Sequence, residues 1–180
     1  MNTNKIIIGI DPGEKGFVSV LTPFGDYEFC SISESLKGDV DKFIKRQVDI
    51  SRDKSCGLIA VMEEVHALFG SSAKSTFSFG RINGMLEAML ISNGVPYHLV
   101  QPKVWQKEIW INQDKIYKDS GRRGKDGKLI KTVDQKPTSI NAARRLFPNV
   151  DLRRSSKCRN VDDNKCDSLL MAEYARRKNL

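Results

Sequence analysis

Acidic side chains end several apolar segments of this sequence. The stretch IIIGIDPGEKG (6–16) has the pattern of a buried strand stopped by Pro-Gly, and it carries Asp11 at its end. A second apolar segment, GLIAVME (57–63), ends in Glu63 and is followed by Glu64. Taking a carboxylate out of water is costly unless a positive charge compensates for it. Asp11 is therefore either a solvated residue that opens a turn or a metal ligand on a rigid strand.

Strand alternation places Glu63 and Glu64 on opposite faces of the second strand. If this strand neighbours the first one, one of the two glutamates faces the same side as Asp11. Adjacent strands lie about 4.8 Å apart, so two carboxylates at their ends could share a cation. The alternative is that both glutamates are solvated.

A third acidic group lies in NVDDNKCDSLLMAEYARR (160–177). On a helix, Asp167 shares one face with apolar residues three, four and seven positions later, and that face is expected to pack on the sheet. Asp163 lies about 40° around the helix axis from Asp167, and it is either a second inward acid or the N-cap. Asp162 is the alternative inward residue.

Clustered carboxylates repel one another and become largely protonated unless cations neutralise them. Two Mg²⁺ ions, for which Mn²⁺ would substitute, would remove this repulsion, and such a pair supports phosphodiester cleavage. The chain has 30 Lys+Arg against 22 Asp+Glu, a net charge of +8, which favours a polyanionic partner. An acidic pocket in a basic protein predicts a nuclease.

The remaining pattern predicts the elements that position these acids. We expect strands at 5–10, 17–22, 27–32, 57–63 and 95–100, and helices at 39–50, 75–94, 102–110, 136–147 and 163–178. This order, βββαβαβα, is that of an α/β fold with a mixed five-stranded sheet flanked by helices. The length of 180 residues predicts a single domain, 1–180, with an insertion at 111–136. This Gly-, Lys- and Arg-rich segment is predicted to be a mobile basic loop or a hairpin around GKDGK.

Basic and aromatic residues supply candidate DNA contacts in two segments. In KSTFSFGR (74–81), the aromatic residues either stack on bases between basic residues that bind phosphate, or simply pack in the core. The four candidates in this segment are Lys74, Phe77, Phe79 and Arg81. In the basic insertion, Arg122 and Arg123 would add electrostatic affinity for DNA, and the alternative is a solvated segment without this role.

Three motifs, IIIGIDPGEKG, AVMEEV and DSLLMAEYA, together resemble the RuvC-type Holliday junction resolvases of the ribonuclease H-like superfamily. The order of elements matches, and FSFGRINGMLEAMLISNGVPYHLVQPKVWQK and SINAARRLFPNVD are similar to the chloroplast branch and its phage-type relatives. The resemblance covers nearly the whole chain except the basic insertion. It implies a ribonuclease H-like fold and cleavage of four-way DNA junctions with Mg²⁺.

The resemblance also implies roles for the acids. Asp11 matches the family's first-strand aspartate, Glu63 its fourth-strand glutamate and Asp167 its last helical acid. The fourth ligand is Asp162 or Asp163, because helical geometry favours Asp163 and the chloroplast branch matches Asp162 more closely.

Three lysines and two ring-bearing residues complete this resemblance. Lys136 lies where RuvC proteins carry a lysine near the cleavage site, and Lys103 and Lys107 are similar in context. The family also inserts an aromatic residue into the junction centre, and His66 and Phe69 are the two candidates for that place.

Other functions remain open. The GIDPG turn also resembles the phosphate-binding turn of actin-like sugar kinases and ATPases, although those folds need two such lobes. A junction-binding protein that does not cut would use the acids only for structure. A ribonuclease H-like nuclease could instead act on other branched DNA or on RNA–DNA hybrids.

The symmetry of a four-way junction bears on quaternary structure. The junction has two strands to cut at symmetric positions, and a two-fold dimer with two active sites could cut both most easily. The 75–94 helix carries apolar residues around more than half of its circumference: Phe77, Phe79, Met85, Leu86, Met89 and Leu90. We therefore expect a homodimer built around this helix.

Cysteine usage bears on the compartment. The four cysteines form no CxxC pair and only two histidines are available, so free thiols are expected and a zinc site is not. We see no secretory signal and no run long enough to span a membrane. We expect the cytoplasm of a bacterial or phage-infected cell, or another reducing compartment that contains DNA.

Overall fold

The central sheet is built around its first strand. In this computed structural model, which describes residues 4–32, 39–64 and 72–180, five strands lie in the order β3-β2-β1-β4-β5. The strands are β1 (Lys5–Asp11), β2 (Phe17–Leu21), β3 (Tyr27–Ser31), β4 (Gly57–Glu63) and β5 (Tyr97–Val100). β2 and β3 form an antiparallel meander with β1, whereas β4 and β5 run parallel to it. The mixed five-stranded sheet expected from the sequence is therefore confirmed.

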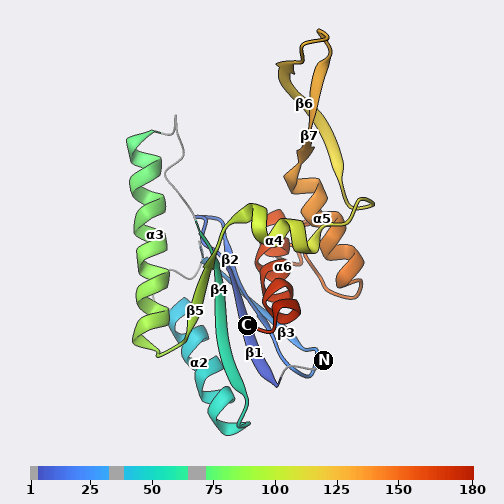
Figure 1. Ribbon diagram of the computed structural model, residues 1–180. Coiled ribbons are helices and arrows are strands. Elements are labelled where there is room, and N and C mark those ends of the chain that lie inside the picture. Colours follow the sequence, from blue (N-terminus) through green and yellow to red (C-terminus); the bar gives the residue numbers. More distant parts are fainter. Residues whose placement is uncertain (1–3, 33–38, 65–71) are drawn as a thin grey trace.

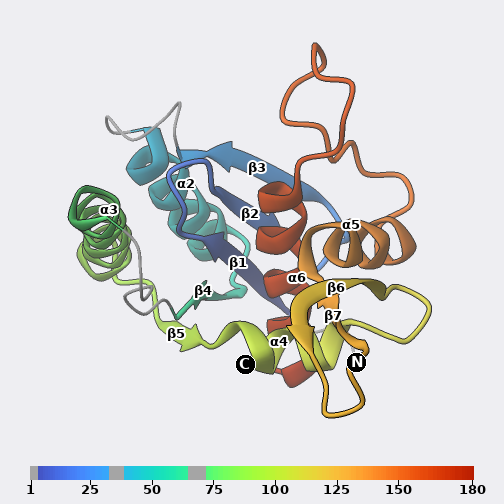
Figure 2. The same ribbon diagram turned by 90° about the horizontal axis from the view of Figure 1, so that it is seen from above.

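Helices cover both faces of this sheet (Figures 1 and 2). On one face lie α2 (Asp39–Asp53) and α3 (Ala73–Ser92), and on the other lie α4 (Pro102–Ile109), α5 (Gln135–Leu146) and α6 (Asp163–Lys178). Each expected helix and strand is present, and most of their ends lie within two or three residues of the expected ones. Within the described ranges, no helix is long and apolar enough to cross a membrane.

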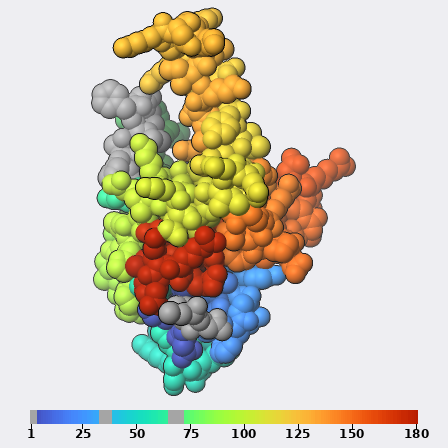
Figure 3. Space-filling model, turned by 45° about the vertical axis from the view of Figure 1, so that its right-hand side comes forward, coloured from blue at the N-terminus to red at the C-terminus, as the bar shows by residue number. Residues whose placement is uncertain are grey.

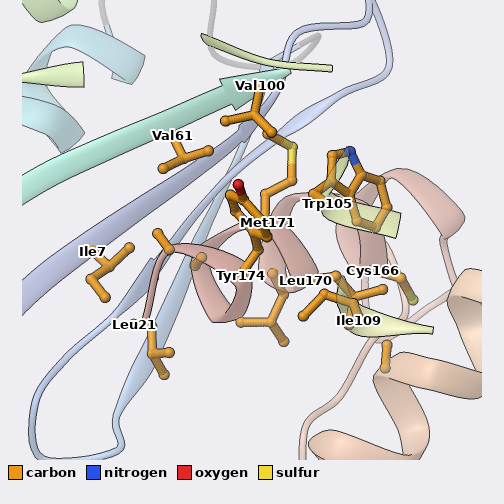
Figure 4. Close-up of a cluster of buried hydrophobic side chains, with 14 of the residues drawn as sticks. Ile7, Leu21, Val61, Val100, Trp105, Ile109, Cys166, Leu170, Met171 and Tyr174 are labelled. Carbon is orange, nitrogen blue, oxygen red and sulfur yellow. The ribbon is translucent and has the colours of Figure 1, made fainter. Parts of the chain in front are cut away.

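The approach of α6 to β1 depends on a glycine. A Cβ atom at Gly9 would collide with the backbone oxygen of Ser168, so only glycine lets the helix lie directly on the strand. Ser168 also exchanges a hydrogen bond with Ser19 of β2. Figure 4 shows the cluster that results, with Met171 of α6 among side chains of the sheet. This close packing sets where the acidic end of α6 meets the end of β1.

The basic insertion forms an antiparallel hairpin of β6 (Ile116–Arg123) and β7 (Leu129–Asp134), called the arm from here on. Its turn is closed by the Gly124 N–H, which donates to the carbonyl oxygen of Lys128 at 2.8 Å. The arm projects from the body of the molecule (Figures 1 and 3). The hairpin around GKDGK that the sequence offered within 111–136 is therefore confirmed.

The base of the arm is tied to α5. The Ile116 N–H donates to the Thr138 hydroxyl at 3.1 Å, and that hydroxyl donates to the carbonyl oxygen of Asp134 at 2.6 Å. Just before the arm, the buried Asp114 pairs with Arg145 of α5 at 2.7 Å. Burial opposes ionisation of Asp114, but the hydrogen bonds from Arg145 and the backbone outweigh it and lower its pKa. The arm thus starts from a fixed point on the helix that carries Lys136.

Candidate active site

Asp11 and Glu63 lie side by side where β1 and β4 end. The parallel register pairs Ile10 with Met62, so the next residue of each strand reaches the same edge of the sheet. Alternation turns both acids toward the face that α6 covers, because Ile10 and Met62 belong to the opposite cluster. The register therefore places Glu63, and not Glu64, on the side of Asp11.

Asp167 of α6 faces this edge of the sheet. Its Oδ1 atom is inaccessible to solvent and, among the described residues, has no hydrogen-bond partner. Burial raises the pKa of Asp167 well above its ordinary value, a hydrogen bond with Ser139 of α5 opposes the rise, and the charges of Asp11 and Glu63 add to it. A buried carboxylate oxygen without a partner is rare in folded proteins and suggests a cation site.

Asp162 and Asp163 have different surroundings. Asp162 is the N-cap of α6: its Oδ1 accepts hydrogen bonds from the backbone of Asn164 and Lys165 at 3.0 and 3.2 Å. Its Oδ2 accepts a hydrogen bond from Arg154 at 2.7 Å. Asp163 is the first residue of the helix, so the N-cap alternative considered for it is wrong. Both carboxylate oxygens of Asp162 therefore already accept hydrogen bonds.

Electrostatic coupling shows that these acids form one group. The pKa of Asp11 is raised to about 7, mainly by burial and next by the charge of Glu63. A hydrogen bond from the Gly13 backbone opposes this rise, and the charges of Asp163 and Asp162 add to it more weakly. Near neutral pH the group therefore holds a proton that a bound cation would displace.

Lys136 joins this group from α5. Its ammonium lies 2.9 Å from Asp163 Oδ2, and this hydrogen bond, together with the charge of Asp163, raises the pKa of Lys136. Its side chain is nevertheless 76% exposed. Lys103 and Lys107 lie exposed on α4 and form no ion pair with the described part of the chain. Of the three lysines suggested by the sequence, only Lys136 directly contacts an acid of the site.

The donor set suits a magnesium ion, although it does not enclose one. Within residues 4–32, 39–64 and 72–180, no three Asp, Glu, His or Cys side chains are gathered tightly enough to form a ready-made metal site. Mg²⁺ does not require such a cage, since it keeps several waters and usually takes one or two carboxylates together with substrate phosphates. The Asp167 oxygen, which has no partner in the described part of the chain, and the shared charge around Asp11 fit such an open site.

The candidate DNA contacts of α3 lie apart from the acids, on the helix that covers the other face of the sheet. Lys74 and Arg81 are exposed, Phe77 is 74% exposed and Phe79 is half-buried outside both core clusters. The core-packing alternative is therefore wrong for Phe77, whereas the half-buried Phe79 leaves both alternatives open. The first turns of α3 project beyond the sheet at the same end of the molecule as the arm (Figure 1).

Arg122 and Arg123 lie near the tip of the arm and are exposed. Arg123 donates to the carbonyl oxygen of Gly127 at 2.7 Å, which braces the turn. The two candidates for a junction-centre residue, His66 and Phe69, lie outside the described residues. The acids thus occupy one edge of the sheet, and the basic arm stands apart from them.

Sequence reasoning missed three residues that hold the acids in place. The Trp105 indole N–H donates to Glu63 Oε1 at 2.9 Å, Ser139 hydrogen-bonds Asp167, and Arg154 bonds Asp162. A signal existed for Ser139, which lies one helical turn after Lys136 and therefore on the same face. A buried tryptophan also needs a partner for its N–H, but nothing in the sequence names Glu63 as that partner.

The comparisons with known proteins bear on the fold alone. The sequence matches no protein-family model and no curated protein. The structure is similar to Thermus thermophilus RuvC in complex with a Holliday junction substrate, with a TM-score of 0.53 and 14% identity over 97% of this chain and 96% of that one. A second Thermus thermophilus RuvC structure has a TM-score of 0.47 and 15% identity over 97% of this chain and 96% of that one. The likeness to the first establishes the ribonuclease H-like fold of RuvC, and a shared fold does not fix an activity.

Proposed function

We propose that this protein is a Mg²⁺-dependent endonuclease of the RuvC type that resolves four-way DNA junctions. The observation that carries the proposal is that Asp11 and Glu63 end neighbouring strands at one edge of the sheet, with Asp167 of α6 close enough for their charges to raise its pKa. Similarity to a fold captured with a Holliday junction substrate supports the choice of substrate. The assignment to the chloroplast and phage-type branch rests on sequence motifs alone.

Four carboxylates would hold the metal: Asp11, Glu63, Asp163 and Asp167. Asp163 is preferred over Asp162 as the fourth ligand, because capping and Arg154 already engage both oxygens of Asp162. Bound Mg²⁺ would supply the activation of water and the stabilisation of the leaving oxygen that phosphodiester hydrolysis needs. The protein's part is to fix the carboxylates on β1, β4 and α6, which are rigid elements.

Lys136 would bind the DNA backbone beside the acids. Its side chain is 76% exposed, so the ammonium can pair with a phosphate while it stays next to Asp163. This pairing would hold the backbone at the edge of the sheet where the carboxylates lie. Lys103 and Lys107 on α4 would add charge along the same path without touching the acids.

The arm and the start of α3 would grip the DNA away from the cut. The arm segment 115–134 carries seven basic residues against three acidic ones: Lys115, Lys118, Arg122, Arg123, Lys125, Lys128 and Lys131, with Asp119, Asp126 and Asp134. Basic side chains on a projecting two-stranded ribbon suit contact with phosphates along a groove. On α3, Lys74 and Arg81 would bind phosphates, and the exposed Phe77 would stack on an unpaired base.

A homodimer built on α3 would present two such sites to the symmetric strands of a junction. Ile82, Leu86 and Leu90 face the core, whereas Phe77 and Ile91 are exposed. The exposed side of α3 around Ile91, away from the DNA-contacting first turns, would therefore face the second subunit. Sedimentation at micromolar concentration tests this: a 20.3 kDa species that is unchanged by junction DNA would contradict the dimer.

The decisive experiment compares substrates side by side. A four-way junction, a flap, a plain duplex and an RNA–DNA hybrid are incubated with the protein in Mg²⁺ and, as a control, in EDTA. Paired, symmetric cuts in the junction only, and only with Mg²⁺, are the expected result. Preferential cutting of the hybrid would favour a ribonuclease H-like activity, and junction binding without any cut would favour a non-cleaving binder.

A further inference from the structure

The two tryptophans of the chain pack against each other but differ in one contact. Trp105, on α4, is fully buried, and its ring lies 5.9 Å from that of Trp110 in an edge-to-face arrangement. The Trp105 N–H donates to Glu63 Oε1 at 2.9 Å. The Trp110 N–H is buried as well but finds no acceptor in the described part of the chain. Two similar rings thus share one environment, and only one of them bonds to a site acid.

The bond from Trp105 restricts Glu63 in a defined way. An indole N–H donates and cannot accept, so Glu63 must present an oxygen to it. Figure 4 shows Trp105 within the packed cluster that includes Val100 and Met171, so the ring has little freedom to turn. No hydrogen bond within the described residues engages the second oxygen, Oε2. One oxygen is therefore held by a rigid donor, and the other is left for a ligand.

We propose that Trp105 is a positioning residue: its indole N–H fixes the Glu63 carboxylate and leaves Oε2 available for a divalent cation shared with Asp11. This inference rests on the proposed function, because it assigns a metal-ligand role to Glu63. Outer partners that orient metal ligands typically change metal affinity or activity by about 10- to 100-fold when they are removed. Trp105 would be such an outer partner, because its N–H would orient the metal ligand Glu63.

The first test uses the matched pair Trp105→Phe and Trp110→Phe. Both variants exchange an indole for a smaller ring in the same cluster, but only the first removes a bond to Glu63. Trp105→Phe is expected to weaken Mg²⁺ binding, followed by calorimetry, by about 10-fold or more, and Trp110→Phe by less than about twofold. Thermal unfolding of both variants measures the shared cost of packing. Equal losses of Mg²⁺ affinity in the two variants would overturn the proposal.

The second test does not depend on how Trp105→Phe folds. The chain has two tryptophans, so Trp110→Phe leaves Trp105 as the sole tryptophan, which is excited selectively over the tyrosines. Titration with MgCl₂ is expected to shift the emission of this tryptophan saturably, and the further change Asp11→Asn is expected to weaken that response by 10-fold or more. An emission spectrum that does not respond to Mg²⁺ up to tens of millimolar would contradict the proposal.

The two readouts separate this inference from the nuclease assignment. A Trp105 response to Mg²⁺ that depends on Asp11, in a protein that cuts no DNA, would uphold the positioning role and reject the nuclease. Junction cleavage and Mg²⁺ affinity that are both unchanged in Trp105→Phe would uphold the nuclease and reject the positioning role of Trp105.

Discussion

The two faces of the central sheet are built from the same strands but differ in the side chains that they carry. On β1, Ile6, Ile8 and Ile10 pack under α2 and α3, whereas the alternate positions end in Asp11 under α6. The face under α2 and α3 is purely apolar at this strand. The face under α6 also has an apolar cluster, and at one edge it carries half-buried carboxylates. The difference teaches that strand alternation lets one strand support the core and hold a charged site at once.

The largest effect should come from removing a charge on the acidic face. Asp11→Asn or Asp167→Asn keeps the shape of the side chain but removes a proposed metal ligand. Junction cleavage in Mg²⁺ is expected to fall by well over 100-fold, beyond the effect typical of outer partners. Junction binding in EDTA should stay within about twofold of the wild type, since the basic surfaces supply it. Cleavage at a near-normal rate by Asp11→Asn would mean that the site is misassigned.

The neighbouring residue on the other face provides the control. Ile10→Ala should lower the free energy of unfolding by about 2–5 kcal/mol because it leaves a cavity in the apolar cluster. Well below its melting temperature, this variant should still cut junctions close to the wild-type rate. Loss of cleavage in a folded Ile10→Ala protein would erase the distinction between the two faces.

A second pair tests the register of β4. Glu63→Gln should reduce junction cleavage nearly as much as Asp11→Asn, because Glu63 lies beside Asp11 at the sheet edge. Glu64→Gln should have little effect, because Glu64 follows the strand and alternation turns it away from the acids. Single-turnover cleavage rates at saturating Mg²⁺ measure both. The opposite order of activities would show that the two strands pair differently.

A smaller effect is expected from the arm, which belongs to neither face. The double change Arg122→Ala and Arg123→Ala should weaken junction binding several-fold without changing the cleavage rate of bound DNA. Each lost phosphate contact should also reduce the slope of log K against log salt by about 1. Lys45→Ala with Arg52→Ala on α2 removes the same charge elsewhere and should leave the slope unchanged. An identical loss in both double variants would indicate that only net charge matters.

The smallest effect concerns pH and the metal-free protein. Burial and the neighbouring acids raise the pKa of Asp11 from 3.8 to about 7, so between these values the folded state binds a proton that the unfolded chain does not. Stability contributed in this way is full below pH 3.8 and is lost as the pH rises through 7.

The melting temperature in EDTA should therefore fall between pH 5.5 and 8, by about 2–4 °C for each kcal/mol lost. Asp11→Asn should flatten this fall, and Mg²⁺ should oppose it most at the higher pH. A melting temperature that rises over this range in EDTA would contradict the raised pKa.

The sequence was sufficient for the fold because its signals are local. Runs such as IIIGI and the Pro-Gly and Asn-Gly breaks predict each strand and helix without knowledge of distant contacts. Asp11, Glu63 and Asp167 could also be singled out as candidate site residues, because each acid interrupts an otherwise apolar pattern. Alternation predicts only that one of Glu63 and Glu64 faces Asp11 when the two strands are neighbours, and the choice of Glu63 rests on the resemblance to the RuvC-type family.

The partners of these acids could not be predicted in the same way. The contact of Trp105 with Glu63 spans 42 residues of sequence, and that of Arg154 with Ser31 spans 123. Such pairs depend on how α4 and the 153–162 segment fold back, which no local pattern encodes. The choice between Asp162 and Asp163 stays open at the level of the sequence for the same reason, because it depends on where Arg154 and Lys136 lie.

The pairing at the base of the arm makes this hairpin exchangeable. Because Ile116 lies opposite Asp134, the chain leaves and re-enters the body at neighbouring points, and the bond to Thr138 fixes that junction from the body side. Cutting the hairpin back to the Asp119–Lys131 pair and closing it with a short turn would leave this base intact. The hairpin can therefore be exchanged for another two-stranded ribbon at this position without a change to the sheet.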